Sequence, residues 1–342
     1  MSIPLARLEE IIDASGVAPR VEALLPIGVR HRQLRVRTLL AGMLLSQADH
    51  RPAHLTRVRD ALTALPEPDQ VRLGVTEDWK TGPHQLTYRQ TERTFGLVTG
   101  ALAQDVPDGL PSQILARVCD ELLEASIPEE HKHASTALAV DWTDVETFSR
   151  PPPHGTSDCA DPEASWGRRK GGGPGQDSEL FYGYYASAAT MMREEHGPLV
   201  PELARRMTVC SCRHDPARAL VPVLTAMPGQ GIPLGDILDD SGYAHRDAGA
   251  WAIPLRQAGA QLIQDLHPSD RGPKGTRHGA IIANGNLYCP ATPRPLLELG
   301  PLARDATPEE TTTHDTQTAE LAPWRTANSG ASPATTKTAT TG

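Results

Sequence analysis

The chain has 342 residues, of which 39% are hydrophobic and only 4% aromatic, and its formal net charge is -9 at pH 7. The length suits about two domains. The acidic balance excludes uniform affinity for nucleic acid, so any such contact must come from local basic patches. The longest strongly apolar run, residues 39–45, is too short to span a membrane.

Residues 1–130 have the pattern of an all-helical domain. Leu5, Leu8, Ile11 and Ile12 recur on one helical face, and Gly16 ends that segment. Further helices are predicted at residues 38–47, 54–65 and 112–125. Because several arginines lie on these helices, we expect an N-terminal helical domain that contacts DNA.

The pattern changes near Ser135, where short apolar runs begin to alternate with one another and with helical segments. Asp215 followed by Pro216 predicts the start of a helix that extends to residue 227. Another helix is expected from about Arg246, interrupted by Pro254. The Pro- and Gly-rich stretch 149–179 is predicted to be a flexible loop. Residues 131–270 are therefore expected to form a mixed sheet, with strands at 136–142, 181–189, 207–212, 236–240 and 261–266.

Beyond residue 270 the chain changes character twice. Residues 280–283 and 286–289 flank Asn284-Gly285, which predicts a β-hairpin. An acidic segment follows, and together they form a region, residues 271–322, that we interpret as a partial insertion. Residues 323–342 are rich in Thr, Ala and Ser and have almost nothing to bury, so they are predicted to be a disordered tail.

Two aspartates follow apolar runs in short strings that suggest strand ends. Asp141 lies in Ala-Val-Asp-Trp-Thr, and Asp240 lies in Ile-Leu-Asp-Asp-Ser-Gly-Tyr. If the fold brings the two carboxylates together, they can hold a divalent metal ion, which is the chemistry of phosphodiester cleavage and joining. The alternative is that both are ordinary strand-end aspartates, because Asp is common at turns.

The strings around these aspartates occur in a particular order with three others. In chain order the five strings are Leu-Ala-Val-Asp141-Trp-Thr143, Asp161-Pro-Glu-Ala164, Phe181-Tyr-Gly183-Tyr184, Thr208-Val-Cys-Ser-Cys-Arg-His214-Asp215 and Leu238-Asp239-Asp240-Ser-Gly242-Tyr243. Together they resemble bacterial insertion-sequence transposases of the DDE type over roughly residues 34–266. The resemblance implies a ribonuclease H-like α/β fold with a mixed sheet, preceded by the helical domain.

The resemblance also implies a reaction and a set of site residues. Asp141 and Asp240 correspond to the first two catalytic metal ligands, which hold Mg²⁺ or Mn²⁺. Asp239 is a less favoured alternative, because it would point to the opposite side of its strand. The implied activity is cleavage of the transposon end and strand transfer into target DNA. The implied partners are transposon-end and target DNA and a second copy of the chain in a dimer.

A third acidic ligand, a glutamate on a later helix, is expected from the resemblance. The candidates are Glu298, Glu309, Glu310 and Glu320, and Glu298 has the best helical setting. None has the Tyr- and Arg-rich context of the family. We therefore expect the third ligand to be missing and the chain to be truncated at its C-terminus. Two rival interpretations stay open: a non-catalytic DNA-binding transposase remnant, and a metal-dependent nuclease unrelated to transposition.

Basic residues gather in two places that could contact DNA phosphates. Between Arg30 and Asp60 there are seven arginines and two aspartates, and a second basic spot follows Gly167. Arginines on a helix can bind phosphates, although a solvated helix face with salt bridges is the alternative. The residues singled out are Arg35, Arg37, Arg57, Arg59, Arg168, Arg169 and Lys170.

The five cysteines are odd in number and scattered, which favours a reducing compartment over a disulfide framework. No N-terminal signal pattern is present, so we expect a bacterial cytoplasmic, nucleoid-associated protein with no membrane contact. Cys210 and Cys212 lie on one face of a predicted strand, but no second Cys pair follows at zinc-ribbon spacing, so strand packing is the favoured role.

Overall fold

The computed structural model describes residues 3–26, 34–48, 54–75, 77–78, 82–83, 85–103, 112–153, 159–169, 179–244, 246–264, 271–299 and 306–320. The chain divides into two compact units, Met1–Gly235 and Asp236–Gly342. This division falls at neither residue 130 nor residue 270. The described elements begin with helices and continue with both antiparallel and parallel strand pairs. The prediction of a helical N-terminal region followed by mixed α/β structure is therefore confirmed.

The N-terminal region is helical, as predicted, but it has more helices than the sequence pattern indicated. Gly16 adopts a left-handed φ of 65° and ends the first helix. The additional helices are α2, α5 and α6. The elements here are α1 (Leu5–Ser15), α2 (Val17–Leu24), α3 (Val36–Ala48), α4 (Leu55–Thr63), α5 (Glu67–Arg72), β1 (Glu77–Asp78), β2 (Gly82–Pro83), α6 (Tyr88–Leu102), α7 (Gln113–Ser126) and a 3₁₀ turn (Glu129–His131).

The helix α6 begins with a start signal that apolar periodicity does not reveal. The Thr87 side chain accepts a hydrogen bond from the backbone N–H of Gln90, and the Gln90 side chain accepts one from the backbone N–H of Thr87. This reciprocal capping box satisfies two N–H groups that a helix start leaves unpaired. The buried side of α6 packs with α3 and α4, around a core that includes Leu39, Leu62 and Val98.

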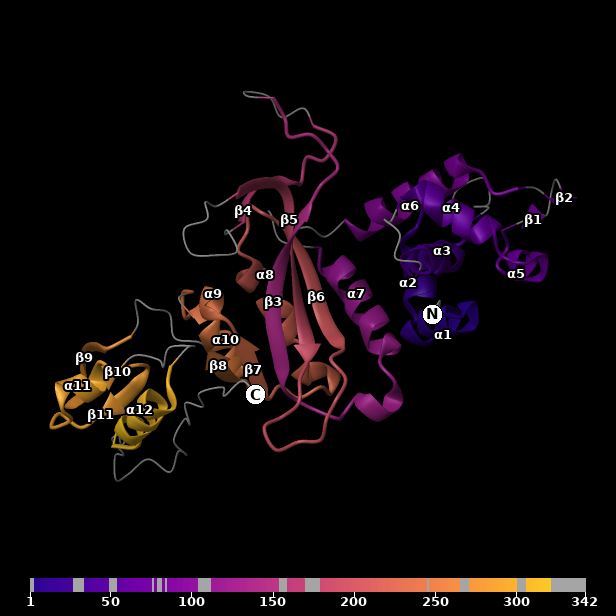
Figure 1. Cartoon of the computed structure of the whole chain (residues 1–342). Helices are drawn as coiled ribbons and strands as arrows, with labels where there is room; N and C mark the ends of the chain where they lie inside the picture. The colour runs from indigo at the N-terminus through magenta and orange to yellow at the C-terminus, as the bar shows by residue number, and fades with distance from the viewer. Residues whose placement is uncertain are drawn as a thin grey trace. The chain divides into compact units, whose positions relative to one another are not determined.

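The strands β3 to β6 of the first unit pair antiparallel with one another through β5. In Figure 1 the long central strand of this antiparallel sheet, β5 (Glu179–Met191), lies between β3 (Leu138–Glu146) and β6 (Ala204–Ser211). A further strand, β4 (Ser165–Arg169), pairs with the first part of β5. The prediction of a loop over residues 149–179 is wrong at β4. Gly167 and Arg168 have the composition of a linker, but they pair with Phe181 and Leu180 of β5. β3 also extends four residues past its predicted end at Trp142.

The helix α8 (Pro216–Thr225) covers part of one face of this sheet. It starts at Asp215, whose side chain accepts from the backbone N–H of Ala217 at 3.0 Å, as predicted. Pro222 lies inside α8, and a 3₁₀ turn (Pro228–Gln230) follows. The buried Ser187 of β5 donates a hydrogen bond to the Pro216 carbonyl at 3.4 Å. α8 therefore packs on the face of the sheet to which Ser187 points.

α7 joins the helical region to the sheet by a buried ion-pair cluster. Arg205 and Arg206 are only 2% and 1% exposed. Arg205 donates to the Glu124 carboxylate at 2.7 Å and Arg206 at 3.2 Å. Burial raises the pKa of the neighbouring Asp120 to about 6. Because α7 contacts α1 as well as β6, the helices and the antiparallel sheet belong to one unit.

The second unit contains a parallel strand pair and a small antiparallel sheet. The Asn284-Gly285 turn has φ values of 48° and 74°, as the predicted hairpin requires. The helix expected from Arg246 is wrong in position: a short α9 comes earlier and α10 starts later. α12 was not predicted, and residues 323–342 lie outside the described part. The elements are β7 (Asp236–Asp239), α9 (Ser241–Ala244), α10 (Ala252–Gln257), β8 (Gln261–Gln264), β9 (Pro273–Arg277), β10 (Ala280–Ala283), β11 (Asn286–Tyr288), α11 (Arg294–Leu297) and α12 (Pro308–Glu320).

Candidate functional site

Asp141 lies inside β3 and not at its end, so that part of the sequence interpretation is corrected. Its neighbour Val140 is buried, whereas Asp141 is exposed, because successive side chains of a strand point to opposite faces. One carboxylate oxygen of Asp141, Oδ1, accepts from the backbone N–H of Trp142 at 2.7 Å. β3 thus presents Asp141 on the solvent-facing side of the antiparallel sheet.

Asp240 directly follows β7, which ends one residue before the predicted strand 236–240. Its Oδ1 accepts from the backbone N–H of Gly242 at 2.7 Å, which satisfies a donor at the start of α9. The Asp240 side chain is exposed. Asp240 therefore has the same local character as Asp141: an exposed carboxylate held by one backbone N–H.

Asp239 points the other way, as the alternation of the strand predicted. It is 9% exposed, and its Oδ2 accepts from Trp251 Nε1 and from Gln264 Nε2, both at 2.9 Å. Burial raises the pKa of Asp239 to about 6, against the lowering effect of these two hydrogen bonds. Asp239 therefore ties β7 to α10 and β8, and the exposed Asp240 is the better candidate for a ligand.

The two exposed aspartates have donor atoms that suit a hard divalent cation. Their Oδ2 atoms accept no hydrogen bond from the part of the chain that the structure describes. Carboxylate oxygens are the ligands that Mg²⁺ prefers. Asp141 belongs to the first unit and Asp240 to the second. Among the described residues, no group of three or more His, Cys, Asp or Glu side chains is arranged to hold a metal.

The candidates for a third ligand all lie in the second unit. Glu298 is the C-cap of the short α11, and its carboxylate accepts from Arg294 Nε at 2.6 Å. Glu309 and Glu310 lie in the first turn of α12, where Glu310 accepts hydrogen bonds from Thr307. Glu320 is the last residue of α12. Each of the first three is exposed, and Glu298 and Glu310 already have local partners.

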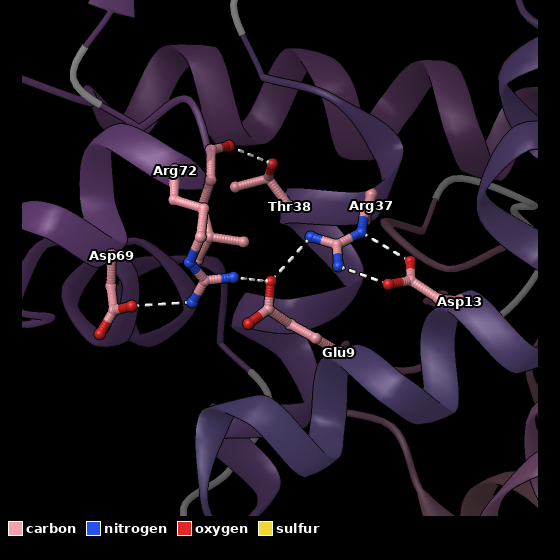
Figure 2. Close-up of polar contacts among 7 residues, drawn as sticks. Glu9, Asp13, Arg37, Thr38, Asp69 and Arg72 are labelled. Carbon is pink, nitrogen blue, oxygen red and sulfur yellow. Dashed lines mark hydrogen bonds and ion pairs between the residues drawn. The ribbon is translucent and has the colours of Figure 1, made fainter.

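Arg37, one of the arginines proposed to contact DNA, belongs to an ion-pair network inside the helical region. Figure 2 shows Arg37 reaching two carboxylates of α1. Its Nε and Nη2 donate to Asp13, both at 2.7 Å, and its Nη1 donates to Glu9 at 2.9 Å. Arg72 also donates to Glu9 and to Asp69. The network therefore links α1, α3 and α5, and the Arg37 guanidinium has a structural role.

Glu9 lies at the centre of this network and is 5% exposed. Burial by itself would raise the pKa of Glu9, but the hydrogen bonds from Arg72 and Arg37 outweigh it. The pKa of Glu9 consequently lies below its ordinary value of 4.5. The hydrogen bonds from Arg37 likewise lower the pKa of Asp13. Both carboxylates are therefore ionised at neutral pH and hold the two guanidinium groups.

The other proposed DNA-contact residues fall into two groups. Arg59 is paired with Asp60 at 2.5 Å, and Arg169 is paired with Asp144, with Glu146 at 2.9 Å and with Glu179 at 3.6 Å. Within the described ranges, the guanidinium groups of the remaining three arginines form no ion pair. Those three are Arg35, Arg57 and Arg168, and Lys170 lies outside the described residues.

Hydrogen bonds around Asp161 hold the segment before β4 in place, a role that the sequence did not predict. Tyr184 donates to Asp161 Oδ1 at 2.5 Å, Thr147 donates to Oδ2 at 2.7 Å, and the backbone N–H of Ala164 donates to Oδ1 at 3.3 Å. These bonds tie the segment before β4 to β5 and to the end of β3. The only sequence signal was the Asp-Pro-Glu-Ala string, whose partners are remote in the chain.

A comparison with known protein families, curated proteins and solved structures finds no significant match. Across the described residues, no helix combines the length and the apolar character that crossing a membrane requires.

Proposed function

We propose that this chain is a DDE-transposase-like protein with a ribonuclease H-like core, built for metal-dependent DNA cleavage and strand transfer. The observation that carries the proposal is the matched character of Asp141 and Asp240. Each is an exposed carboxylate with one oxygen held by a backbone N–H and the other without a described partner. Each also lies in a sequence string that resembles the family's metal-ligand strings.

The order of elements supports the fold part of this proposal. β3, β5 and β6 pair antiparallel, and then α8, β7, α10 and the parallel strand β8 follow along the chain. This succession agrees with the strand and helix order that a ribonuclease H-like core requires. β4, which lies between β3 and β5 in the chain, is additional to that order.

The proposed chemistry assigns a task to each residue. Mg²⁺ or Mn²⁺, when bound, would activate the attacking oxygen and stabilise the leaving oxygen of the phosphodiester. Asp141 and Asp240 would hold the ion through their Oδ2 atoms. Arg35, Arg57 and Arg168 would contact DNA phosphates. The partners would be the transposon ends and the target DNA, with a second copy of the chain in a dimer.

A second candidate function is DNA binding without catalysis. The observation that favours it is the state of Glu298, the best candidate for a third ligand by sequence. Its exposed carboxylate, at the C-cap of the four-residue helix α11, accepts from Arg294 at 2.6 Å. A site with two carboxylates binds metal more weakly than one with three, so strand transfer would be slow or lost.

A nicking assay on supercoiled plasmid carrying the inverted-repeat ends tests the proposal. We expect nicking that needs Mg²⁺ or Mn²⁺ and falls at least 100-fold in Asp141→Asn and in Asp240→Asn. The matched controls are Asp144→Asn, on the other face of β3, and Asp236→Asn, at the start of β7. These controls should keep nicking within about threefold, because their carboxylates are not assigned to the metal.

The alternatives predict different results in the same assay. DNA binding with no metal-dependent nicking in the wild-type chain favours the non-catalytic function. Nicking with no preference for the inverted-repeat end favours a nuclease unrelated to transposition. Nicking that survives in Asp141→Asn removes that residue from the proposed site.

A further inference from the structure

One face of the antiparallel sheet, the open face, carries Asp141 and the exposed side chains of β3. Alternation along β3 places Asp141, Thr143 and Val145 on this face, and all three are exposed. Val145 is paired with Tyr184 of β5, and Tyr182 lies two residues earlier on the same face. The open face therefore continues from Asp141 to the first part of β5.

An aromatic pair lies at the far end of this open face. Trp166 of β4 is the cross-strand partner of Tyr182, and their ring centroids are 5.6 Å apart with an interplanar angle of 64°. Trp166 is 56% exposed and Leu180 is 58% exposed. Large side chains that gather on an exposed face, and are not scattered singly, indicate a binding surface.

Arg168 supplies a positive charge next to the aromatic pair. It is the cross-strand partner of Leu180 and lies two residues from Trp166, so both side chains point to the open face. Arg168 is exposed, and within the described segments its guanidinium has no ion-pair partner. Arg213 adds a second cation nearby, where it donates to the carbonyls of Pro162 and Glu163 at 3.2 and 3.3 Å.

The opposite face of the same strands differs in both packing and charge. Arg169 points there, lies 5.5 Å from the Phe181 ring centroid and is paired with Asp144 and Glu146. These acidic side chains are thus turned away from Arg168. On the open face, Asp161 lies against the two tyrosines of β5: its carboxylate accepts from Tyr184, and its carbonyl accepts from Tyr182 at 3.3 Å. The exposed Glu163 is the remaining acidic group in that segment.

We propose that Trp166, Tyr182 and Arg168 form a binding surface for an unpaired DNA strand, whose bases stack on the two rings and whose phosphate contacts Arg168. This inference rests on the proposed function. Aromatic rings beside a cation suit single-stranded nucleic acid, because every base has a face that can stack. A duplex keeps its base faces covered, and an apolar protein partner would leave Arg168 without a counter-charge.

The distance between this surface and Asp141 suits a single DNA strand that contacts both. Asp141 is paired with Ala188 and Trp166 with Tyr182, so six residues of β5 separate the two positions. At about 3.3 Å per residue this separation is roughly 20 Å. The DNA strand bound by the aromatic pair would therefore be the one that extends away from the scissile phosphate.

The test is fluorescence anisotropy with a labelled 20-nucleotide single strand of mixed sequence, using the full chain. We expect Trp166→Leu and Tyr182→Leu each to weaken binding by roughly 5- to 150-fold, the range for loss of one stacked base. Trp166→Phe should stay within about threefold of wild type, because it keeps a ring that can stack. Leu199→Ala, an 86% exposed apolar residue between β5 and β6, is the control and should bind as wild type.

The outcomes separate this inference from the proposed function. If the wild-type chain binds the single strand and Trp166→Leu binds it equally well, the stacking surface is wrong while the proposed function stands. If Trp166→Leu and Trp166→Phe lose affinity equally, the ring does not act by stacking and the inference is also wrong. If Trp166→Leu weakens binding but Asp141→Asn leaves nicking unchanged, the stacking surface is supported and the proposed metal site is wrong.

Discussion

Gly183 of β5 lies against the backbone of β3, and its place in the Phe-Tyr-Gly-Tyr string has a steric reason. A Cβ at this position would lie 2.1 Å from the carbonyl oxygen of Val145. No side chain can be accommodated there unless the two strands separate. The residue thus lets β5 and β3 pair through to Glu146, which is the cross-strand partner of Gly183.

A substitution at Gly183 should therefore disturb the sheet. We expect Gly183→Ala to lower the free energy of unfolding by about 3 kcal/mol, at the upper end for overpacking because the obstacle is backbone. Gly229→Ala is the matched control, since a Cβ there would meet nothing within 4 Å. Chemical denaturation followed by circular dichroism measures both, and equal stability of the two variants would contradict the steric explanation.

Glu9 is a second residue whose environment leads to a measurable effect, this time on pH dependence. Its pKa is below its ordinary value of 4.5 because Arg72 and Arg37 bind the carboxylate. The stabilisation is therefore present above about pH 4.5 and is lost as the pH falls through the lowered pKa. The helical region should lose stability on acidification in this range.

The variant Glu9→Gln tests that expectation. At pH 7 it should be less stable than wild type by about 1–3 kcal/mol, because two guanidinium groups lose a charged partner. The difference should shrink as the pH falls below 4.5 and through the lowered pKa of Glu9, since the wild-type carboxylate then becomes protonated. A difference that stays constant over this range would show that Glu9 acts by shape and not by charge.

At the scale of elements, α7 is attached to β6 by two carboxylates, of which Glu124 accepts the hydrogen bonds and Asp120 lies 3.8 Å from Arg206. Glu124 accepts hydrogen bonds from Arg205 and Arg206, which are both almost completely buried. Removing one partner of a buried ion pair leaves a charge without compensation, which is far more destabilising than loss of a surface pair. Glu124 is therefore expected to be critical for joining the helical region to the sheet.

We expect Glu124→Ala to lower the free energy of unfolding by about 3–5 kcal/mol. The control is Glu121→Ala on the same helix, whose partners Arg20 and Arg117 are 40% and 71% exposed. That change should cost about 1 kcal/mol or less, because exposed ion pairs contribute little. Thermal unfolding of the two variants provides the comparison. Equal losses of stability would argue against the buried cluster as the main connection between α7 and β6.

The elements also show which sequence signals are reliable. Helices with a clear apolar stripe, such as α1 and α7, were predicted to within a few residues. β4 was missed because its Gly-Arg-Arg run has the composition of a linker, and only the pairing with β5 makes it a strand. α6 carried a Thr87–Gln90 capping box that could have been found from the sequence.

At the scale of the whole molecule, the question is where DNA would bind. The chain is acidic overall, and Arg37, Arg59 and Arg169 are engaged by carboxylates of the protein itself. The phosphate contacts in our proposal therefore rest on the arginines without described ion pairs. Each phosphate contact contributes about 0.9 to the slope of log affinity against log salt.

Salt titration of duplex DNA binding measures that contribution directly. We expect Arg57→Ala to weaken binding uniformly across sequences and to reduce the salt slope by about 1. Arg117→Ala is the control, because Arg117 is 71% exposed, is paired with Glu121 and is not assigned to DNA. An unchanged slope in Arg57→Ala would remove α4 from the proposed DNA surface.

The sequence by itself determined the helical N-terminal region, most of the strands, the N-cap at Asp215 and the hairpin turn at Asn284-Gly285, because these depend on local periodicity and turn chemistry. It also placed Asp239 and Asp240 on opposite sides, since side-chain alternation is a local property of a strand. Only the tertiary structure decided which arginines are already paired and that Asp161 holds the segment before β4. It also showed that Trp166 and Arg168 share an open face with Asp141. These depend on residues far apart in the chain, whose meeting no local pattern encodes.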